Sequence, residues 1–533
     1  MTIQSTKLLT SLPSNPNELI PILARRVERL PAGGLKLRKL SGIETVDDFR
    51  RSVETETPGI YLPVSDRIRT ASEGSPLARP IQIGPYTSRN SVYQNAIEGW
   101  DGKDDGNVSP AILRRYARLA KSGVGILSIE ATAVQEDGRA NRRQLCLTKE
   151  TAASFKMLYD HILKIHEQTF GTNEGFIIVL QLTHSGRYSH LLPLLACNIP
   201  VIDKRKNGPV VDDDYMQRLK ESYVEAAKIA YAIGIRVIDL KACHGYFMHE
   251  TFSAFTRKGK YGGMDLRQRT KFYEEVVKAI KEECPGMVII SRLSAIDCIP
   301  FHADINNPGP QGFGYGVPDD WRDPHMMFGL NHHDPQEVDI REAVELAEIM
   351  HNELGLPMIN VSAFCPYTNP HASRPGFYAA KTEVAYDVPE HPYIGLARFL
   401  AAAKIIKEYV PGIKVVSTGG SVLQRFFVPY GEGVVEEGFA DAFGVGRQNL
   451  ANPNVIRQAL FGEAINHDID CQGFLDCIAN PRRGGRSLCW PFDKDPYPGP
   501  DDPPADQHEE FKALQAHKRE LTAKNRARRE TKK

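Results

Sequence analysis

The chain has 533 residues, of which 41% are hydrophobic and 25% charged, and its 66 basic residues balance 66 acidic ones. This composition is ordinary for a globular protein, and a net charge of zero gives no basic excess to attract nucleic acid or an anionic membrane. No stretch approaches the roughly 20 apolar residues of a membrane span, and no signal peptide is recognisable. The nine cysteines form no CxxC pair, which predicts reduced thiols and a cytoplasmic protein.

Residues 1–79 are polar, proline-rich and weakly periodic, and they are predicted to form an N-terminal extension that packs on the following domain. Beyond them, short apolar runs alternate with segments of helical period. Eight runs are predicted as strands: 91–96, 123–130, 176–182, 235–240, 287–293, 357–362, 414–419 and 441–446. Apolar strands separated by amphipathic helices favour a parallel sheet covered on both faces. Eight such units predict an α/β fold, a (β/α)8 TIM barrel over residues 80–465; an open doubly wound sheet is the alternative.

Two long segments, 295–338 and 362–394, follow the fifth and sixth predicted strands and are rich in glycine, proline and aromatic residues. Loops of this length are usually functional or disordered, and the aromatic residues favour function. Residues 466–498 are predicted to form a C-terminal rim segment. Residues 499–533 are predicted to be a charged tail, either a solvated helix or a frayed end. An oligomer contact or an RNA-attracted basic end is the alternative for the tail.

Polar residues follow nearly every predicted strand, as expected where a barrel carries its chemistry. After the seventh and eighth strands, Gly419, Gly420, Gly446 and Arg447 suit a phosphate site. Glycine lets backbone N–H groups approach a phosphate, and an arginine can add a bidentate contact.

Two further strand-end residues suit the other end of such a ligand. The amide of Gln181 can both donate and accept at a uracil-like edge. The permanent cation of Arg292 favours electron-rich states of a neighbouring ring. A salt bridge across the barrel mouth is the alternative for Arg292.

Seven motifs together resemble the old yellow enzyme family of FMN-dependent oxidoreductases. In chain order they are "NSVYQNAIEGWDG", "IEATAVQEDGRAN", "LQLTHSGR", "ACHGY", "SRLS", "TGGS" and "VGRQNLANP". The resemblance implies that FMN sits in the barrel mouth, that NADH or NADPH reduces it, and that hydride passes from flavin N5 to an electron-poor alkene.

The resemblance also implies residue roles. Tyr246 matches the proton donor, and His244 matches one member of the pair that binds the substrate carbonyl. The predicted cofactor-binding residues are Asn95, Ala96, Ile97, Glu98, Ala131, Gln181, Arg292, Gly419, Gly420, Gly446 and Arg447. The predicted substrate-binding residues are Tyr367, His371 and Arg374.

Lys241 departs from the family pattern, which has histidine at this position. An ammonium there is either catalytic or structural, and burial would depress its pKa unless a carboxylate partners it. Glu98 and Glu130, both expected at neighbouring strand ends, are the predicted partners.

Cys471, Cys477 and Cys489 lie where some larger relatives bind a 4Fe–4S cluster. A cluster normally needs four thiolates, so no metal is predicted. A small-molecule substrate is expected, with no nucleic-acid or membrane partner, and exposed barrel helices are compatible with a homo-oligomer. Two alternative functions stay open: oxidation of an amine or similar substrate, and a non-catalytic flavin-binding barrel whose tail contacts a partner.

Overall fold

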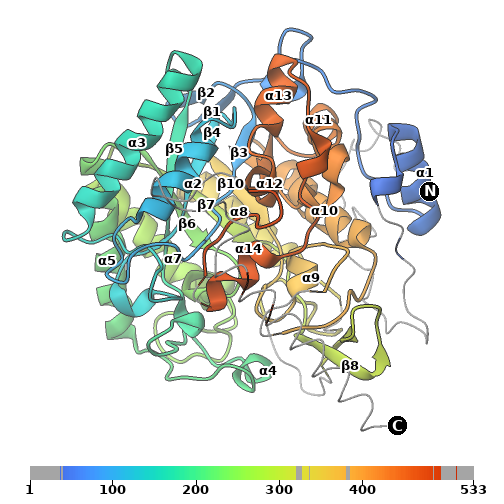
Figure 1. The fold of residues 1–533 in the computed structure, drawn as a ribbon. Helices are drawn as coiled ribbons and strands as arrows, with labels where there is room; N and C mark the ends of the chain where they lie inside the picture. Colours follow the sequence, from blue (N-terminus) through green and yellow to red (C-terminus); the bar gives the residue numbers. More distant parts are fainter. Residues whose placement is uncertain are drawn as a thin grey trace.

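The computed structural model describes residues 37, 40–319, 327–334, 337–379, 384–483, 485–493, 512 and 516. Its centre is a closed barrel of eight parallel strands (Figure 1). The strands are β3 (Val92–Gln94), β4 (Ile126–Ala133), β5 (Ile177–Thr183), β6 (Val237–Ala242), β7 (Val288–Ser294), β10 (Met358–Ser362), β11 (Lys414–Ser417) and β12 (Ala442–Val445). Each overlaps one predicted strand, so the TIM barrel is confirmed. The open-sheet alternative is wrong, because Val445 of the last strand pairs with Gln94 of the first.

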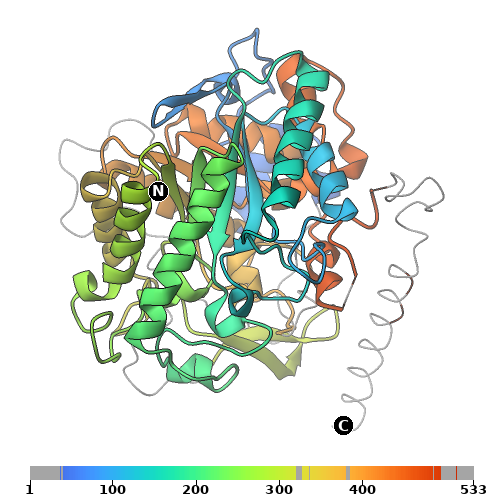
Figure 2. The same cartoon turned by 90° about the vertical axis from the view of Figure 1, so that its left-hand side faces the viewer.

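Helices surround the barrel (Figure 2). They are α2 (Pro110–Ala120), α3 (Ala152–Phe170), α5 (Asp213–Ala232), α7 (Leu266–Glu283), α8 (Arg341–Glu348), α10 (Pro392–Tyr409), α11 (Phe427–Glu436), α12 (Arg447–Ala451) and α13 (Val455–Phe461). In α5, the Asp212 side chain caps the first turn by accepting from the Tyr215 N–H. Asp213 and Asp214 add negative charge at the positive end of that helix. No helix in the described ranges is both long and apolar enough to cross a membrane.

The inward-facing side chains of the barrel change from apolar to polar along the strands. At one end, Ile81 and Ile83 of the hairpin β1 (Ile81–Ile83)–β2 (Tyr86–Ser88) join Val237 in an apolar cluster. Because side chains alternate between the faces of a strand, Asp239 and Lys241 share the face of Val237. The sequence of β6 therefore places charged groups above an apolar base, toward the C-terminal end of the barrel.

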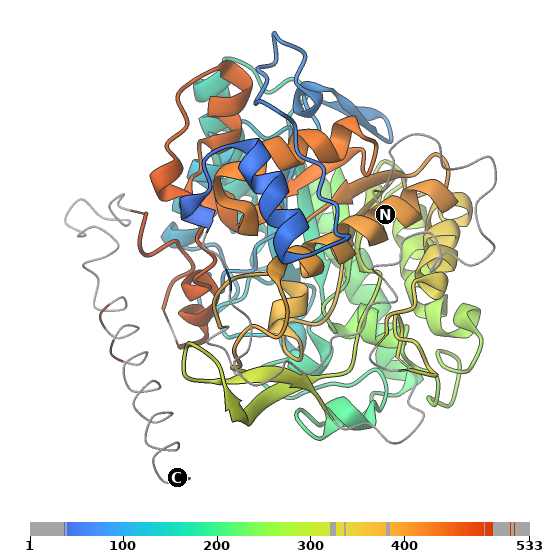
Figure 3. The ribbon, with the colours of Figure 1, turned by 90° about the vertical axis from the view of Figure 1, so that its right-hand side faces the viewer.

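The segments after β7 and β10 contain structure that the sequence did not predict. The first carries the hairpin β8 (Phe301–Pro308)–β9 (Gly314–Pro318), and the second carries the short helix α9 (Pro370–Ser373). The hairpin lies at the lower end of the molecule in Figure 3. The C-terminal segment adds two short helices, α14 (Asp476–Ala479), labelled near the middle of Figure 1, and η10 (Pro481–Arg483).

The N-terminal segment contributes helix α1 (Val46–Glu56), which packs beside α10 and α11 (Figure 3). The Phe49 ring stacks on Phe426 with 4.5 Å between ring centroids. Residues 1–36 lie outside the described residues, as does the predicted tail 499–533 apart from residues 512 and 516. The predicted domain boundaries stay predictions.

Candidate active site

A cavity of about 190 Å³ opens at the C-terminal ends of the barrel strands. Most of the predicted site residues line it. They are Asn95, Ala96, Ile97, Glu98, Gln181, Lys241, His244, Tyr246, Arg292, Tyr367, Arg374, Gly419, Gly446 and Arg447. The sequence therefore identified most of the wall of one cavity, from segments that are far apart along the chain.

Three predicted residues lie outside this cavity lining. The Ala131 carbonyl accepts a hydrogen bond from the Gln144 side chain at 2.9 Å. A side chain built on Gly420 would come within 3.0 Å of the Phe443 ring, so this glycine packs against the core. His371 is buried, and its Nε2 lies 3.1 Å from the Tyr386 carbonyl oxygen. The structure does not bring the imidazole of His371 to the cavity where substrate binding was predicted.

Gln181 and Arg292 share a buried carboxylate that the sequence analysis did not single out. The Gln181 amide donates to Asp239 Oδ2 at 2.6 Å, and the Arg292 backbone N–H donates to Asp239 Oδ1 at 2.7 Å. Burial raises the pKa of Asp239 to about 6, partly offset by these hydrogen bonds and the charge of Arg292. At neutral pH the carboxylate therefore accepts the amide N–H, which leaves the carbonyl oxygen of Gln181 for a ligand.

A left-handed turn directs the two predicted reactive residues after β6. His244 has φ of +64° and Gly245 has φ of +74°. A non-glycine residue in this region carries strain that is typical of functional sites. Two contacts hold the turn: the His244 N–H donates to Ser294 Oγ at 3.1 Å, and His244 Nε2 lies 2.8 Å from Ser362 Oγ.

Glu98 is the centre of a hydrogen-bond cluster in the cavity wall. Its carboxylate accepts from Lys241 Nζ at 2.7 Å, from Trp100 Nε1 at 2.8 Å and from the Tyr246 hydroxyl at 2.8 Å. The predicted carboxylate partner of Lys241 is therefore Glu98. The Tyr367 hydroxyl lies 2.9 Å from that of Tyr246, and because the Tyr246 proton points to Glu98, Tyr367 is the donor of this second bond.

The protonation states of the reactive pair follow from burial and neighbouring charge. Burial and then the Glu98 carboxylate raise the pKa of Tyr246 well above its ordinary value, so the phenol keeps its proton. Burial, followed by the charges of Arg292 and Lys241, lowers the pKa of His244 well below its ordinary value. The cavity therefore presents a neutral imidazole and a protonated phenol at neutral pH.

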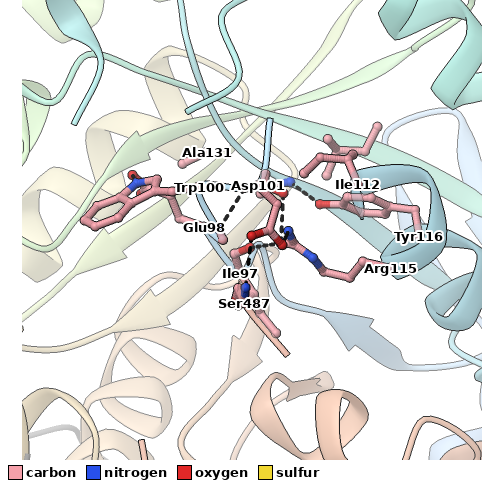
Figure 4. Close-up of polar contacts among 12 residues, drawn as sticks. Ile97, Glu98, Trp100, Asp101, Ile112, Arg115, Tyr116, Ala131 and Ser487 are labelled. Atoms are coloured by element: carbon pink, nitrogen blue, oxygen red, sulfur yellow. Dashed lines mark hydrogen bonds and ion pairs between the residues drawn. The ribbon is translucent and has the colours of Figure 1, made fainter. Parts of the chain in front are cut away.

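The other predicted partner of Lys241, Glu130, belongs to a different network that braces the segment carrying Glu98 (Figure 4). Arg115 of α2 donates to Glu130 Oε1 at 3.0 Å and also pairs with Asp101. Glu130 Oε2 accepts from the Gly99 N–H at 2.8 Å. Because Gly99 and Asp101 flank Trp100, this buried network fixes the backbone next to the cluster around Glu98.

The predicted phosphate site has open space and an unsatisfied donor. A side chain built on Gly446 would meet no atom within 4 Å, and Gly419 has φ of +102°. Among the residues that the structure describes, neither Arg447 Nη1 nor Arg292 Nε, both buried, has a hydrogen-bond partner. Within the described residues, no carboxylate forms an ion pair with either guanidinium. An anionic ligand would supply the missing acceptors.

Comparisons with known proteins identify flavin-dependent oxidoreductases as similar to this chain. Residues 76–312 match the NADH:flavin oxidoreductase / NADH oxidase family. Over these residues the chain is similar to flavin-dependent oxidoreductases of that family. An NADPH dehydrogenase of Bacillus cytotoxicus is 27% identical over 236 residues, which cover 43% of this chain and 65% of that protein. The match thus spans just under two thirds of the length of this curated relative.

Two solved structures show the same fold as this chain. Histamine dehydrogenase from Rhizobium sp. 4-9 has a TM-score of 0.56 at 19% identity, covering 78% of this chain and 52% of that one. The old yellow enzyme homologue from Zymomonas mobilis has a TM-score of 0.50 at 16% identity, and the match covers 73% of this chain and 94% of that one. Identities this low support the barrel fold alone.

The three cysteines of the C-terminal segment lie together. Cys471, Cys477 and Cys489 line a second, small cavity of about 20 Å³. Burial raises the pKa of Cys477 to about 12, so its sulfur is a thiol at neutral pH. Within the described part of the chain, no group of three or more His, Cys, Asp or Glu side chains is arranged to hold a metal ion.

The sequence did not single out Trp100, which lines the main cavity, or Asp239, which lies directly behind it. Arg482 also lines the cavity, and only its segment was expected at the barrel rim. An acid inside the apolar run "VIDL" was an available signal for Asp239, because a buried carboxylate requires partners. The segment "PRRGGR" is expected from its sequence to cover the barrel rim, with a clamp on the cofactor phosphate as the alternative, but no local pattern indicates which of its arginines enters the cavity.

Proposed function

We propose that this chain is an FMN-dependent oxidoreductase that uses NAD(P)H to reduce the activated C=C bond of a small molecule. The observation that carries the proposal is the Tyr246 hydroxyl, a protonated phenol in the wall of the cavity that Gln181 and Arg292 also line. The match of residues 76–312 to the NADH:flavin oxidoreductase / NADH oxidase family supports the same chemistry. The curated relative is named an NADPH dehydrogenase, which favours NADPH as the donor.

FMN suits the donor set of the cavity. Arg447, with its unpartnered Nη1, and Gly446, with open space above it, would hold the phosphate. The carbonyl oxygen of Gln181 and the guanidinium of Arg292 would hold the pyrimidine edge of the ring. When bound, FMN supplies the hydride acceptor and donor that the reaction needs.

Tyr246 is the proposed proton donor to the alkene carbon. Losing this proton leaves a phenolate beside the Glu98 carboxylate, which is unfavourable unless other groups compensate. Lys241 Nζ lies 3.4 Å from the centre of the Tyr246 ring, and the Tyr367 hydroxyl donates to the phenol oxygen. The attraction between two opposite unit charges about 4 Å apart is roughly 4 kcal/mol at an effective dielectric constant near 20. We therefore assign Lys241 both roles: it pairs with Glu98 and stabilises the developing phenolate.

His244 is the proposed hydrogen-bond donor to the carbonyl that activates the alkene. Its Nε2 is occupied by Ser362 at 2.8 Å, so Nδ1 is the nitrogen left to face a ligand. A neutral imidazole can donate from Nδ1 when Nε2 accepts from the serine hydroxyl. Ser362 would then fix the tautomer, and a donor aimed at the carbonyl oxygen stabilises the enolate-like charge that builds up there.

The charge of the cavity favours this function over oxidation of an amine. Five basic residues line it, Lys241, Arg292, Arg374, Arg447 and Arg482, against one acidic residue, Glu98. Glu98 already accepts three hydrogen bonds. A cationic amine would therefore meet net positive charge without a free carboxylate, whereas an electron-poor carbonyl compound would be stabilised.

The first test is the visible spectrum of the purified protein, before and after anaerobic addition of NADPH. A bound yellow chromophore that bleaches and is released as FMN on denaturation is the expected result. A colourless protein that does not take up added FMN would refute the cofactor assignment.

The second test replaces Tyr246 with phenylalanine. Reduction of 2-cyclohexenone should fall by about 10²- to 10⁴-fold, while bleaching by NADPH continues at the wild-type rate. Tyr223→Phe is the matched control, because Tyr223 is a buried tyrosine of α5 that lies outside the cavity lining. Unchanged turnover by Tyr246→Phe would remove this residue from its proposed role and favour a non-catalytic flavin-binding barrel.

We also propose a cytoplasmic location. All nine cysteines are free, as expected in a reducing compartment.

A further inference from the structure

The Tyr246 phenol must recover the proton that it gives to the alkene carbon. Within the part of the chain that the structure describes, two side chains hydrogen-bond its oxygen, Glu98 at 2.8 Å and Tyr367 at 2.9 Å. The Glu98 carboxylate also accepts from Lys241 and Trp100, and it has no proton to return. Lys241 has protons, but its Nζ donates to Glu98 and its side chain is only 5% exposed. Neither group therefore suits the return of a proton from solvent.

Tyr367 differs from both groups, because its hydroxyl donates to the Tyr246 oxygen. The bond has this direction since the Tyr246 proton points to Glu98. Tyr246 is 2% exposed, whereas Tyr367 is half-buried in the wall of the main cavity. The Tyr367 hydroxyl therefore stands between the solvent-facing part of the cavity and the buried phenol.

Packing fixes Tyr367 in this position. Its ring stacks on that of Tyr188, with 3.9 Å between the ring centroids and 16° between the planes. The Tyr188 hydroxyl lies 3.3 Å from Cys365 Sγ, which donates to the His244 carbonyl oxygen at 3.2 Å. Because His244 belongs to the left-handed turn just before Tyr246, the same contacts hold the two phenols relative to each other.

The charges around the two phenols favour proton transfer from Tyr367 to Tyr246. Burial and the Glu98 carboxylate raise the pKa of Tyr246 well above its ordinary value, so its phenolate is a strong base. The Arg482 guanidinium lies 5.5 Å from the centre of the Tyr367 ring, and a positive charge nearby stabilises the ionised form of a phenol. The negative charge is therefore more stable on Tyr367 than on Tyr246.

We propose that Tyr367 is a proton relay that returns a proton to Tyr246 in the same step in which Tyr246 protonates the alkene carbon. The Tyr246 hydroxyl turns from Glu98 to the substrate, and its O–H bond breaks as the C–H bond forms. The Tyr367 proton crosses the 2.9 Å to the Tyr246 oxygen, and water then protonates the Tyr367 phenolate. One proton passes from water to the carbon, and the relay moves no electrons. This inference rests on the proposed function and adds a catalytic residue to it.

The first test is Tyr367→Phe, which keeps the ring that stacks on Tyr188 and removes the hydroxyl. Oxidation of the NADPH-reduced enzyme by 2-cyclohexenone should slow about 10- to 100-fold, because the Tyr246 phenolate loses its hydrogen-bond donor. Bleaching by NADPH should continue at the wild-type rate. Tyr378→Phe is the matched control, since Tyr378 is a half-buried tyrosine of the segment after β10 that packs on Phe474, outside the cavity lining.

The second test separates a relay from a hydrogen bond that only stabilises the phenolate. In mixtures of H2O and D2O, the wild-type rate of oxidation by 2-cyclohexenone should depend on the square of the deuterium fraction, because two protons move in one step. The rate of Tyr367→Phe should depend on it linearly, and added imidazole should restore part of that rate by acting as a substitute acid. A wild-type rate that is linear in the deuterium fraction, or independent of it, would overturn the relay.

These measurements distinguish failure of the relay from failure of the proposed function. If NADPH bleaches the wild-type enzyme but 2-cyclohexenone does not reoxidise it, the proposed function fails. If Tyr367→Phe is reoxidised as fast as wild type, the function stands and the relay fails. Bound FMN, measured from the visible absorbance, shows whether the variant is folded. The wild-type experiment in H2O and D2O needs no variant and decides the question if Tyr367→Phe does not fold.

Discussion

Replacing Glu98 with glutamine removes the charge that Lys241 contacts at 2.7 Å. The Lys241 and Glu98 side chains are only 5% and 14% exposed, so the ammonium left behind is largely desolvated. Breaking a buried pair by removing one partner costs about 3–5 kcal/mol. Glutamine still offers an acceptor to Trp100 and Tyr246, so we expect the lower end, about 3 kcal/mol.

The double-mutant cycle with Lys241→Met isolates the pair. Each single variant leaves one buried charge unpaired and should lose about 3 kcal/mol of unfolding free energy, whereas the double variant leaves no unpaired charge and should lose no more than a single variant does. The coupling energy is therefore expected to be at least about 3 kcal/mol. Equilibrium urea unfolding followed by tryptophan fluorescence measures all four proteins.

A surface pair provides the control. Lys156 and Asp160 contact each other along α3, but their side chains are 49% and 54% exposed. The same cycle with Lys156→Met and Asp160→Asn should give a coupling below about 0.5 kcal/mol. If the Glu98–Lys241 coupling is equally small, Lys241 is not held by Glu98 and its assigned role is wrong.

Three further predictions concern the surroundings of the cavity. Because burial raises the pKa of Asp239 to about 6, above about 3.9 in an unfolded chain, its contribution to stability is lost as pH rises through this interval. Between pH 4 and pH 7, the difference in unfolding free energy between Asp239→Asn and wild type should therefore move by about 2 kcal/mol in favour of the variant, as measured by urea unfolding; a pH-independent difference contradicts this. Gly99→Ala places a methyl group 2.1 Å from the Arg115 guanidinium, and we expect it to lower the free energy of unfolding by about 1–3 kcal/mol. A variant as stable as wild type would contradict this. Arg447→Met should weaken FMN binding about 10- to 100-fold in equilibrium dialysis but leave riboflavin, which lacks the phosphate, unaffected; equal losses for both would place the phosphate elsewhere.

The strands and much of the site were predictable because they depend on local patterns. An apolar run such as "FIIVLQL" specifies a strand buried on both faces, and alternation along β6 places Asp239 and Lys241 on one face. The carboxyl ends of parallel strands meet at one end of a barrel. Side chains as distant as Gln181 and Arg447 were therefore expected together, and both line the cavity.

Some local structure was not predictable from such patterns. The β8–β9 hairpin pairs two short strands by backbone hydrogen bonds. Phe301, Ala303 and Ile305 do alternate with polar residues in β8, but this short pattern stands in a segment rich in glycine and proline, which are typical of loops.

The sequence by itself determined that a carboxylate should stand beside Lys241, since a buried ammonium without one is too costly. Only the tertiary structure decided that this carboxylate is Glu98, while Glu130 pairs with Arg115. Only the fold brought Arg482 from the C-terminal segment to Trp100 and Tyr367. The physical reason is the same in both cases. Residue type fixes what a buried charge requires, but the three-dimensional path of the chain fixes which partner comes within hydrogen-bonding distance.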